Sequence, residues 1–155
     1  MVSILILNYN GKAYLYNCLT SVLSQTYQDF EVIIFDNCST DGSIDYVTEK
    51  INDKRVKVIS SERNLGFAGG NNEALKHASG DMIVLLNNDT VVEKEWLSEL
   101  VKCLSESKNA GMVQSLVITE GIPLQYYKKN GTINLFGHNI MEAFEINENG
   151  VGEIF

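Results

Sequence analysis

The sequence has a single proline, three cysteines and no long apolar run, and each shortage excludes a class of protein. One proline in 155 residues, with no low-complexity stretch, gives no sign of an interdomain linker. Cys18, Cys38 and Cys103 show no C-x-x-C spacing, which disfavours a zinc site or a disulfide framework and favours buried free thiols in a reducing compartment. No run approaches the roughly 18 apolar residues of a membrane helix, and the apolar start lacks a basic leader, so we expect a cytoplasmic protein.

Positive charge is scarce as well, with 12 Lys and Arg against 20 Asp and Glu and a formal net charge of −8. Nucleic acids need many cationic side chains to hold their phosphates, so we expect no nucleic-acid partner. A small anionic ligand is still compatible with this charge, because backbone amides or a bound cation hold phosphates locally.

Apolar runs of strand length alternate with segments of helical periodicity. The strand-like runs are mostly continuous, as expected of strands covered on both faces, and lie at residues 2–7, 30–36, 56–60 and 81–86. The helical segments lie at residues 14–26, 39–51, 66–78 and 94–107. Residues 110–118 offer a fifth strand. The alternation predicts an α/β fold with a largely parallel sheet over residues 1–118, followed by an irregular or hairpin tail over residues 119–155.

Ligands of such sheets bind at the carboxyl ends of the strands, so the residues there are the candidates for chemistry. After the first strand, Tyr9 offers a ring that can stack on a planar base, and Asn8 offers amide hydrogen bonds. A polar turn that ends the strand explains both residues equally well. Asp36 ends the second strand and can accept hydrogen bonds from a base or a ribose. Residues 39–41 can cap the next helix, which leaves Asp36 free.

The third strand leads into "RNLGFAGGNNEAL" (63–75), where Gly66, Gly69 and Gly70 lie close together. Each glycine in a helix costs on the order of 1 kcal/mol relative to alanine, so this grouping indicates close approach of a ligand or of another backbone. Tight packing of the helix on the sheet is the structural alternative. Asn64 and Asn71 place amides where this helix begins.

The fourth strand ends in "LLNNDT" (85–90), which places Asn87, Asn88 and Asp89 at its end. A lone aspartate in a loop is most often a cap or a turn residue. Asp89, however, is expected at the same sheet edge as Tyr9, Asp36 and Asn64.

Four segments in this order resemble the family 2 glycosyltransferases, which have the Rossmann-like GT-A fold and use nucleotide-diphosphate sugars. They are "VSILILNYNG" (2–11), "FDNCSTDGS" (35–43), "RNLGFAGGNNEAL" (63–75) and "LLNNDT" (85–90). The "NND" triplet (87–89) matches the D-x-D motif of the family, and "GFAGGNN" is most similar to its rhamnosyltransferase-type branch. The resemblance implies a nucleotide site formed by Asn8, Tyr9, Asp36, Asn64, Gly66, Asn71, Asn87 and Asn88.

The resemblance also implies that Asp89 binds a divalent cation, Mg²⁺ or Mn²⁺. One carboxylate suffices when substrate phosphates and waters complete the octahedron, and Asn87 then contacts the ribose in place of an aspartate. The implied donor is a UDP-sugar or a dTDP-sugar. The implied acceptor is a saccharide or a lipid-linked glycan at the inner face of the membrane, in an inverting reaction of cell-surface polysaccharide synthesis.

The catalytic base has no counterpart in this sequence. The family places it downstream of D-x-D, in a glycine-rich segment followed by an acidic motif, and no glutamate after residue 140 lies in such a motif. We therefore expect the nucleotide-sugar-binding part of a longer transferase, with no catalytic residue assigned. The alternatives are a nucleotide-binding protein without catalysis and a sugar nucleotidyltransferase. "NYNGK" (8–12) disfavours the latter, because only Gly11 and Lys12 match its glycine-rich basic signature.

Overall fold

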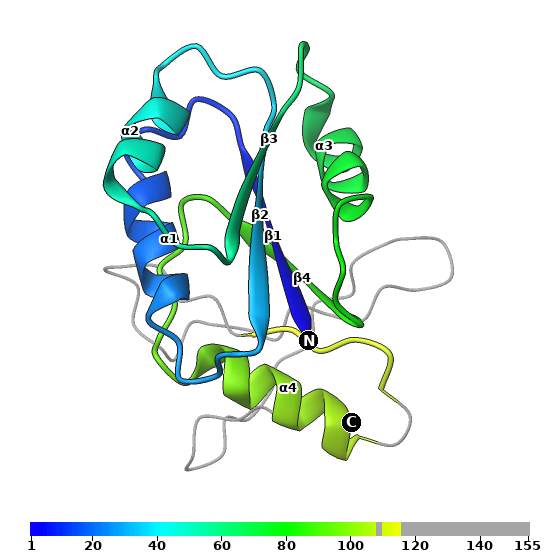
Figure 1. Ribbon diagram of the computed structural model, residues 1–155. Helices are drawn as coiled ribbons and strands as arrows, with labels where there is room; N and C mark the ends of the chain where they lie inside the picture. Colours follow the sequence, from blue (N-terminus) through cyan, green and yellow to red (C-terminus); the bar gives the residue numbers. More distant parts are fainter. Residues whose placement is uncertain (108–109, 116–155) are drawn as a thin grey trace, which may run out of the picture. The chain divides into compact units, whose positions relative to one another are not determined.

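A computed structural model describes residues 1–107 and 110–115, and at its centre is a parallel β-sheet (Figure 1). The strands are β1 (Val2–Asn8), β2 (Phe30–Asp36), β3 (Val56–Ser60) and β4 (Met82–Asn87). Their order across the sheet is β3-β2-β1-β4, and each neighbouring pair is parallel. Met1–Val113 forms one compact unit that contains all of these strands. The predicted α/β fold with a parallel sheet is confirmed.

Helices connect the strands and cover both faces of the sheet. They are α1 (Leu15–Leu23), α2 (Ser43–Lys50), α3 (Gly66–Leu75) and α4 (Trp96–Glu106). Figure 1 shows α1 and α2 together on one side of the sheet and α3 on the other. This arrangement follows from the parallel pairing, because two parallel strands must be joined by a long crossover, usually a helix. Within the described ranges, none of the helices has the length and apolar character needed to cross a membrane.

Burial follows the position of each strand in the sheet. Every residue of the central strand β2 is buried, and in β1 only Leu7 is half-buried. The edge strands β3 and β4 alternate between half-buried and exposed residues along most of their length. Continuous apolar sequence in β1 and β2 is therefore the consequence of helices on both faces.

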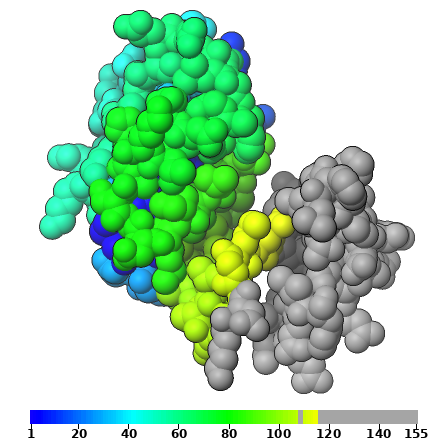
Figure 2. All heavy atoms as spheres, turned by 90° about the vertical axis from the view of Figure 1, so that its right-hand side faces the viewer, coloured from blue at the N-terminus to red at the C-terminus, as the bar shows by residue number. Residues whose placement is uncertain are grey.

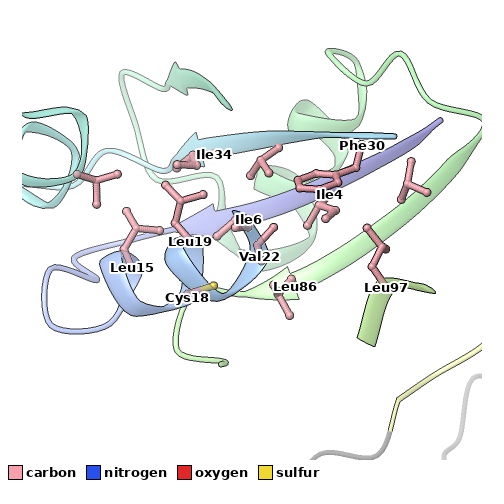
Figure 3. Close-up of a cluster of buried hydrophobic side chains, with 13 residues drawn as sticks. Ile4, Ile6, Leu15, Cys18, Leu19, Val22, Phe30, Ile34, Leu86 and Leu97 are labelled. Carbon is pink, nitrogen blue, oxygen red and sulfur yellow. The ribbon is translucent and has the colours of Figure 1, made fainter. Parts of the chain in front are cut away.

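The larger core lies between the sheet and the helices α1, α2 and α4 (Figure 3). Ile4 and Ile6 of β1 face the α1 side chains Leu15 and Leu19, and all four are fully buried. Leu97 brings α4 into the same cluster. Burial of each such side chain contributes about 1.5–3 kcal/mol to the stability of the fold. This cluster therefore stabilises the sheet whose strand ends carry the predicted site residues.

The opposite face of the sheet is covered by α3, and Figure 2 shows this side of the molecule. Leu5, Ile33 and Phe35 pack here with Ala74 of α3. A Cβ atom at Gly70 would overlap the Leu7 side chain, so glycine allows the helix to approach β1 closely. The packing alternative for this glycine group is thus confirmed at Gly70.

The strands were predicted to within one residue at either end, whereas the helices are shorter than predicted. The segment predicted as helix from residue 39 begins only at Ser43, after Gly42 with a left-handed φ of 71°. Residues 39–41 precede the helix: Ser39 and Thr40 bond to Asn10 in the loop after β1, whereas Asp41 Oδ1 accepts from the Ser43 N–H at the start of α2, as a capping residue does. The predicted fifth strand is not formed over residues 110–115, and residues 116–118 and the tail at 119–155 lie outside the described residues.

Candidate functional site

The parallel sheet brings the predicted site residues to one edge. The strands end at Asn8, Asp36, Ser60 and Asn87, and all four ends point the same way. Tyr9 directly follows β1, and Asp89 is the second residue after β4. Asn64 lies in the connection from β3 to α3. A ligand at this edge would therefore meet residues that are far apart in the sequence.

Asn8 is the centre of a hydrogen-bond network at this edge. Its side chain is fully buried, and its Nδ2 lies within hydrogen-bond distance of Asp36 Oδ1 (3.0 Å), Ser43 Oγ (2.9 Å) and Ser39 Oγ (3.1 Å). Its Oδ1 accepts a hydrogen bond from Asn88 Nδ2 at 2.9 Å. Asn8 thus connects the ends of β1, β2 and β4.

Asp36 is not left free, contrary to the expectation from the sequence. It is 6% exposed, Oδ1 accepts from Asn8, and Oδ2 accepts from the backbone N–H of Ser39 at 3.1 Å. The reason is that Ser39 lies in a loop over the end of β2 and does not cap α2. Asp36, Ser39, Thr40 and Ser60 line a pocket of about 350 Å³. Because each carboxylate oxygen accepts two hydrogen bonds, Asp36 retains capacity for a ligand donor.

Tyr9 lies on the loop after β1, which is hydrogen-bonded to the loop after β2. Asn10 has a left-handed φ of 52°, its N–H donates to Ser39 Oγ at 2.9 Å, and its Oδ1 accepts from the Thr40 N–H at 2.8 Å. The Tyr9 side chain remains 51% exposed. An exposed ring on a cross-linked loop is a preorganised surface for stacking, since little conformational freedom is left to lose.

Asn37 is a second buried asparagine at the edge, and sequence reasoning did not single it out. It is 2% exposed, and its Oδ1 accepts from the Leu65 N–H at 2.8 Å. Its Nδ2 donates to Asn64 Oδ1 at 2.8 Å and to the Gly66 carbonyl at 3.2 Å. Asn37 therefore holds the start of α3 against the end of β2. Its position directly after the buried run 30–36 is the only sequence signal that could have marked it.

Gly66 and Asn71 lie on the segment that Asn37 holds. Gly66 has a left-handed φ of 72° with open space around its Cα, a conformation that other residues adopt only with strain. Asn71 is 9% exposed, and its Nδ2 donates to the Phe67 carbonyl at 2.9 Å within α3. Gly66 is held at the edge by Asn37, whereas Asn71 lies within α3, where its amide already has a partner.

The segment Asn87–Asp89 forms a turn after β4, in which the Thr90 N–H donates to the Asn87 carbonyl at 3.2 Å. Asn87 and Asp89 are exposed and Asn88 is half-buried. Among the described residues, none donates a hydrogen bond to the Asp89 carboxylate, and no group of three His, Cys, Asp or Glu could hold a metal ion. Exposed carboxylate and amide oxygens suit a hard divalent cation that keeps most of its ligands from substrate and water.

The chain that follows this turn is anchored to α1. Ser21 Oγ accepts from the Val92 N–H at 3.1 Å, and Gln25 Oε1 accepts from the Leu97 N–H at 2.8 Å. Gln25 is 1% exposed and also donates to the Glu93 carbonyl at 2.7 Å. Asp89 therefore lies in a short exposed loop between the end of β4 and the segment 92–97, which is bonded to α1 and to Gln25 just after it.

The Cys18 thiol, next to the edge, is not a nucleophile. Burial raises the pKa of Cys18 to about 12, which keeps the thiol protonated, and its Sγ lies 3.5 Å from the Asn87 carbonyl oxygen. The expectation of buried free thiols holds for Cys18, whereas Cys38 and Cys103 are free but half-buried.

Comparisons with known proteins agree with this geometry. The family described as "Glycosyl transferase family 2" matches residues 3–154. The putative teichuronic acid biosynthesis glycosyltransferase TuaG of Bacillus subtilis is 34% identical over 131 residues, which is 82% of this chain and 52% of TuaG. The Escherichia coli UDP-Glc:alpha-D-GlcNAc-diphosphoundecaprenol beta-1,3-glucosyltransferase WfaP is 44% identical over 89 residues, 57% of this chain and 35% of WfaP.

A solved structure gives the same result for the fold. The mannosyltransferase PcManGT of Pyrobaculum calidifontis, in complex with GDP-Man and Mn²⁺, superposes with a TM-score of 0.64 at 26% identity, over 75% of this chain and 35% of that one. The GT-A type of fold is thereby confirmed. The chain spans 52% of the length of TuaG and 35% of WfaP. With a family match that covers nearly its whole length, this chain belongs to glycosyltransferase family 2.

Proposed function

We propose that this chain binds a nucleotide-diphosphate sugar at the carboxyl edge of its sheet, as part of an inverting, metal-assisted glycosyltransferase of cell-surface polysaccharide synthesis. Family membership supports the reaction class. The name of TuaG supports a role in a wall polymer, and the name of WfaP supports a UDP-sugar donor and a lipid-linked acceptor. Action on such an acceptor would place the protein at the inner face of the membrane.

The nucleoside would bind beside the pocket that Asp36 lines. The exposed Tyr9 ring supplies a stacking surface, and the Asp36 carboxylate supplies an acceptor for the N–H of uracil or thymine. Asn64, Gly66 and Asn71 would form the adjoining wall. The name of WfaP, whose donor is UDP-Glc, supports a uridine nucleotide for this donor.

The diphosphate would bind beside the turn after β4. Asp89 would hold Mg²⁺ or Mn²⁺, and the Asn87 amide would hydrogen-bond the ribose. The bound cation supplies neutralisation of the charge that develops on the diphosphate leaving group. The observation that carries the proposal is the exposed Asp89 carboxylate, which no described residue neutralises, at the sheet edge where Tyr9 and Asp36 also lie. Because the site offers one carboxylate, metal affinity in the absence of nucleotide should be low.

No catalytic base is assigned. Inversion requires a carboxylate that removes the proton of the acceptor hydroxyl, and Glu142, Glu145, Glu148 and Glu153 lie outside the described residues. A chain that binds the donor without transferring sugar is therefore the second candidate function, and an assay for transfer to a lipid-linked saccharide separates it from the first.

The test is calorimetric titration of the chain with UDP, dTDP and GDP, each with and without Mn²⁺. We expect Mn²⁺ to tighten binding of UDP or dTDP, and Asp89→Ala to abolish this gain. Asp81→Ala is the matched control, because Asp81 is an exposed aspartate at the opposite end of β4. Equal affinity of a folded sample with and without Mn²⁺ would contradict the metal role, and no binding of any nucleotide would contradict the donor site.

A further inference from the structure

Asn8 and Asn88 form a side-chain pair across two neighbouring strands. Asn88 Nδ2 donates to Asn8 Oδ1 at 2.9 Å, although the two residues are 80 positions apart in the sequence. The backbone of Gly11 lies against this pair, since a Cβ atom there would overlap both Asn88 Nδ2 and Asn8 Oδ1. Gly11 is buried, so no water-filled space separates it from the pair.

The direction of this hydrogen bond is determined by the other partners of Asn8. Asn8 Nδ2 faces the oxygens of Asp36, Ser39 and Ser43, which can accept from it at 2.9–3.1 Å. A flipped Asn8 amide would put its carbonyl oxygen next to the Asp36 carboxylate, which is unfavourable. Asn8 Oδ1 must therefore face position 88, and position 88 must supply a donor.

The pair also limits the freedom of the loop that carries Asp89. Beyond Asn88, the Thr90 backbone bonds to Cys18 of α1, and the Val92 N–H donates to Ser21 Oγ of the same helix. The residues between these points include the exposed Asp89 and Val91, the latter 69% exposed. The Asn88 side chain is thus the anchor that precedes Asp89 and holds it to the end of β1, whereas Thr90 and Val92 hold the following residues to α1.

We propose that Asn88 is a positioning residue, which through its hydrogen bond to Asn8 fixes the Asp89 carboxylate relative to Asp36. This inference rests on the proposed function, and it assigns Asn8 and Asn88 a role different from direct contact with the nucleotide. Asn8 touches Asp36 with one end of its amide and Asn88 with the other, so it couples the nucleoside side of the site to the metal side.

The substitution Asn88→Asp separates this role from that of a ligand. A carboxylate at position 88 cannot donate to Asn8 Oδ1, so we expect the Mn²⁺-dependent gain in UDP affinity to fall by about tenfold. The gain is the ratio of the UDP affinities with and without Mn²⁺ in the same variant, so repulsion of the diphosphate by the added carboxylate, present in both measurements, does not count toward it. If Asn88 were instead a ligand of the cation, an added carboxylate would tighten Mn²⁺-dependent binding, and that result would overturn the proposal.

Two further variants exclude trivial explanations. Asn52→Asp makes the same charge change at an exposed residue before β3, far from the carboxyl edge, and should leave both affinities unchanged. Equal losses in Asn52→Asp and Asn88→Asp would mean a general charge effect and would also overturn the proposal. In Gly11→Ala the added Cβ atom would overlap the Asn8–Asn88 pair. This variant should therefore lose as much of the Mn²⁺-dependent gain in UDP affinity as Asn88→Asp does.

A measurement without ligand keeps this inference separate from the proposed function. If the wild-type chain shows no Mn²⁺-dependent UDP binding, the proposed function fails, and backbone order parameters then test the anchor alone. We expect Asn88→Ala to lower the NMR order parameters of Asp89 and Thr90 relative to wild type, with Asn52→Ala as control. Unchanged order parameters at both positions would refute the anchoring role.

Discussion

The Asn37 side chain ties the end of β2 to Asn64, whose Oδ1 accepts a hydrogen bond from Asn37 Nδ2 at 2.8 Å. The same Asn64 oxygen accepts from the Gly66 N–H at 2.8 Å, and Asn37 Oδ1 accepts from the Leu65 N–H at 2.8 Å. Two asparagines thereby supply acceptors for backbone N–H groups at the start of α3, where the residue at the N-cap position, Leu65, has no polar side chain to do so.

Removing this link should loosen the start of α3. In Asn37→Ala the N–H of Leu65 loses its acceptor, and leaving a partly buried donor unsatisfied costs about 1–3 kcal/mol. We expect amide hydrogen exchange at Leu65 and Gly66 to accelerate by about tenfold or more, while exchange in the core strand β1 changes less. Asn72→Ala, at an exposed position of α3, is the control and should leave these two rates as they are. Equal rates in wild type and Asn37→Ala would refute the link.

The strands and the site residues were predictable from the sequence to different degrees. The apolar runs of β1 and β2 predict their bounds because both faces are covered, so nearly every side chain is apolar until the strand ends; the exceptions, Ser3 and Glu31, are buried and bond to each other. The polar residues at those ends could be located, but their partners could not. Asn37 contacts residues 27 to 29 positions away, and only the parallel order of the strands brings them together.

The expectation that Asp36 has no partner was wrong for the same reason. Ser39 and Asp41 have the side chains of helix caps, and local sequence alone favours that role. In the fold, Asp41 Oδ1 does accept from the Ser43 N–H at the start of α2, at 3.0 Å. The Ser39 hydroxyl, however, accepts from the Asn10 N–H and Asp41 Oδ2 accepts from the Lys12 N–H, both at 2.9 Å and both from the loop after β1. A contact between the loops that follow two different strands leaves no pattern in the sequence of either loop, so the partners of Asp36 and Ser39 could not be predicted.

Gly70 should tolerate no larger side chain as long as Leu7 is present. A Cβ atom at Gly70 would overlap the Leu7 side chain, and overpacking of this kind costs about 1–3 kcal/mol. We expect Gly70→Ala to lower the free energy of unfolding by that amount in urea titrations. Leu7→Ala provides the space again, so the double variant should lose less stability than the sum of the two single variants. Strictly additive losses would show that the overlap is not the cause.

Glu31 should stabilise the fold in a pH-dependent way. It is 6% exposed and accepts from Lys57 Nζ at 2.7 Å, from Ser3 Oγ at 2.7 Å and from the Ser79 N–H at 2.6 Å. Burial alone would raise the pKa of Glu31, but these hydrogen bonds outweigh burial and lower the pKa from 4.5 to about 2. The ionised form is therefore bound more tightly in the folded state than in the unfolded state.

The sign of the pH dependence follows from this lowered pKa. The stabilisation is complete above the unfolded value of 4.5 and is lost as pH falls toward about 2. Glu31→Gln should lower the free energy of unfolding by about 2 kcal/mol at neutral pH, and the difference from wild type should shrink across that acidic window. Urea unfolding at a series of pH values measures it, with Glu49→Gln on the exposed face of α2 as control. A difference that is constant down to the acid limit would exclude ionised Glu31 as its source.

Tyr9 and Tyr14 provide a matched pair for the stacking role. Both side chains are exposed, at 51% and 57%, but Tyr9 follows β1 directly whereas Tyr14 immediately precedes α1. Stacking of a base on an aromatic ring contributes about 1–3 kcal/mol, so Tyr9→Ala should weaken UDP binding by about tenfold to a hundredfold. Tyr14→Ala removes an exposed ring of the same kind and should leave the affinity within about twofold of wild type, because the Tyr14 ring is not assigned to the base. Calorimetric titration in the absence of metal isolates the nucleoside contribution from that of Asp89.

If both variants bind UDP as wild type does, the ring at position 9 does not stack on the base, and the nucleoside must be held by Asp36 and the wall of its pocket instead.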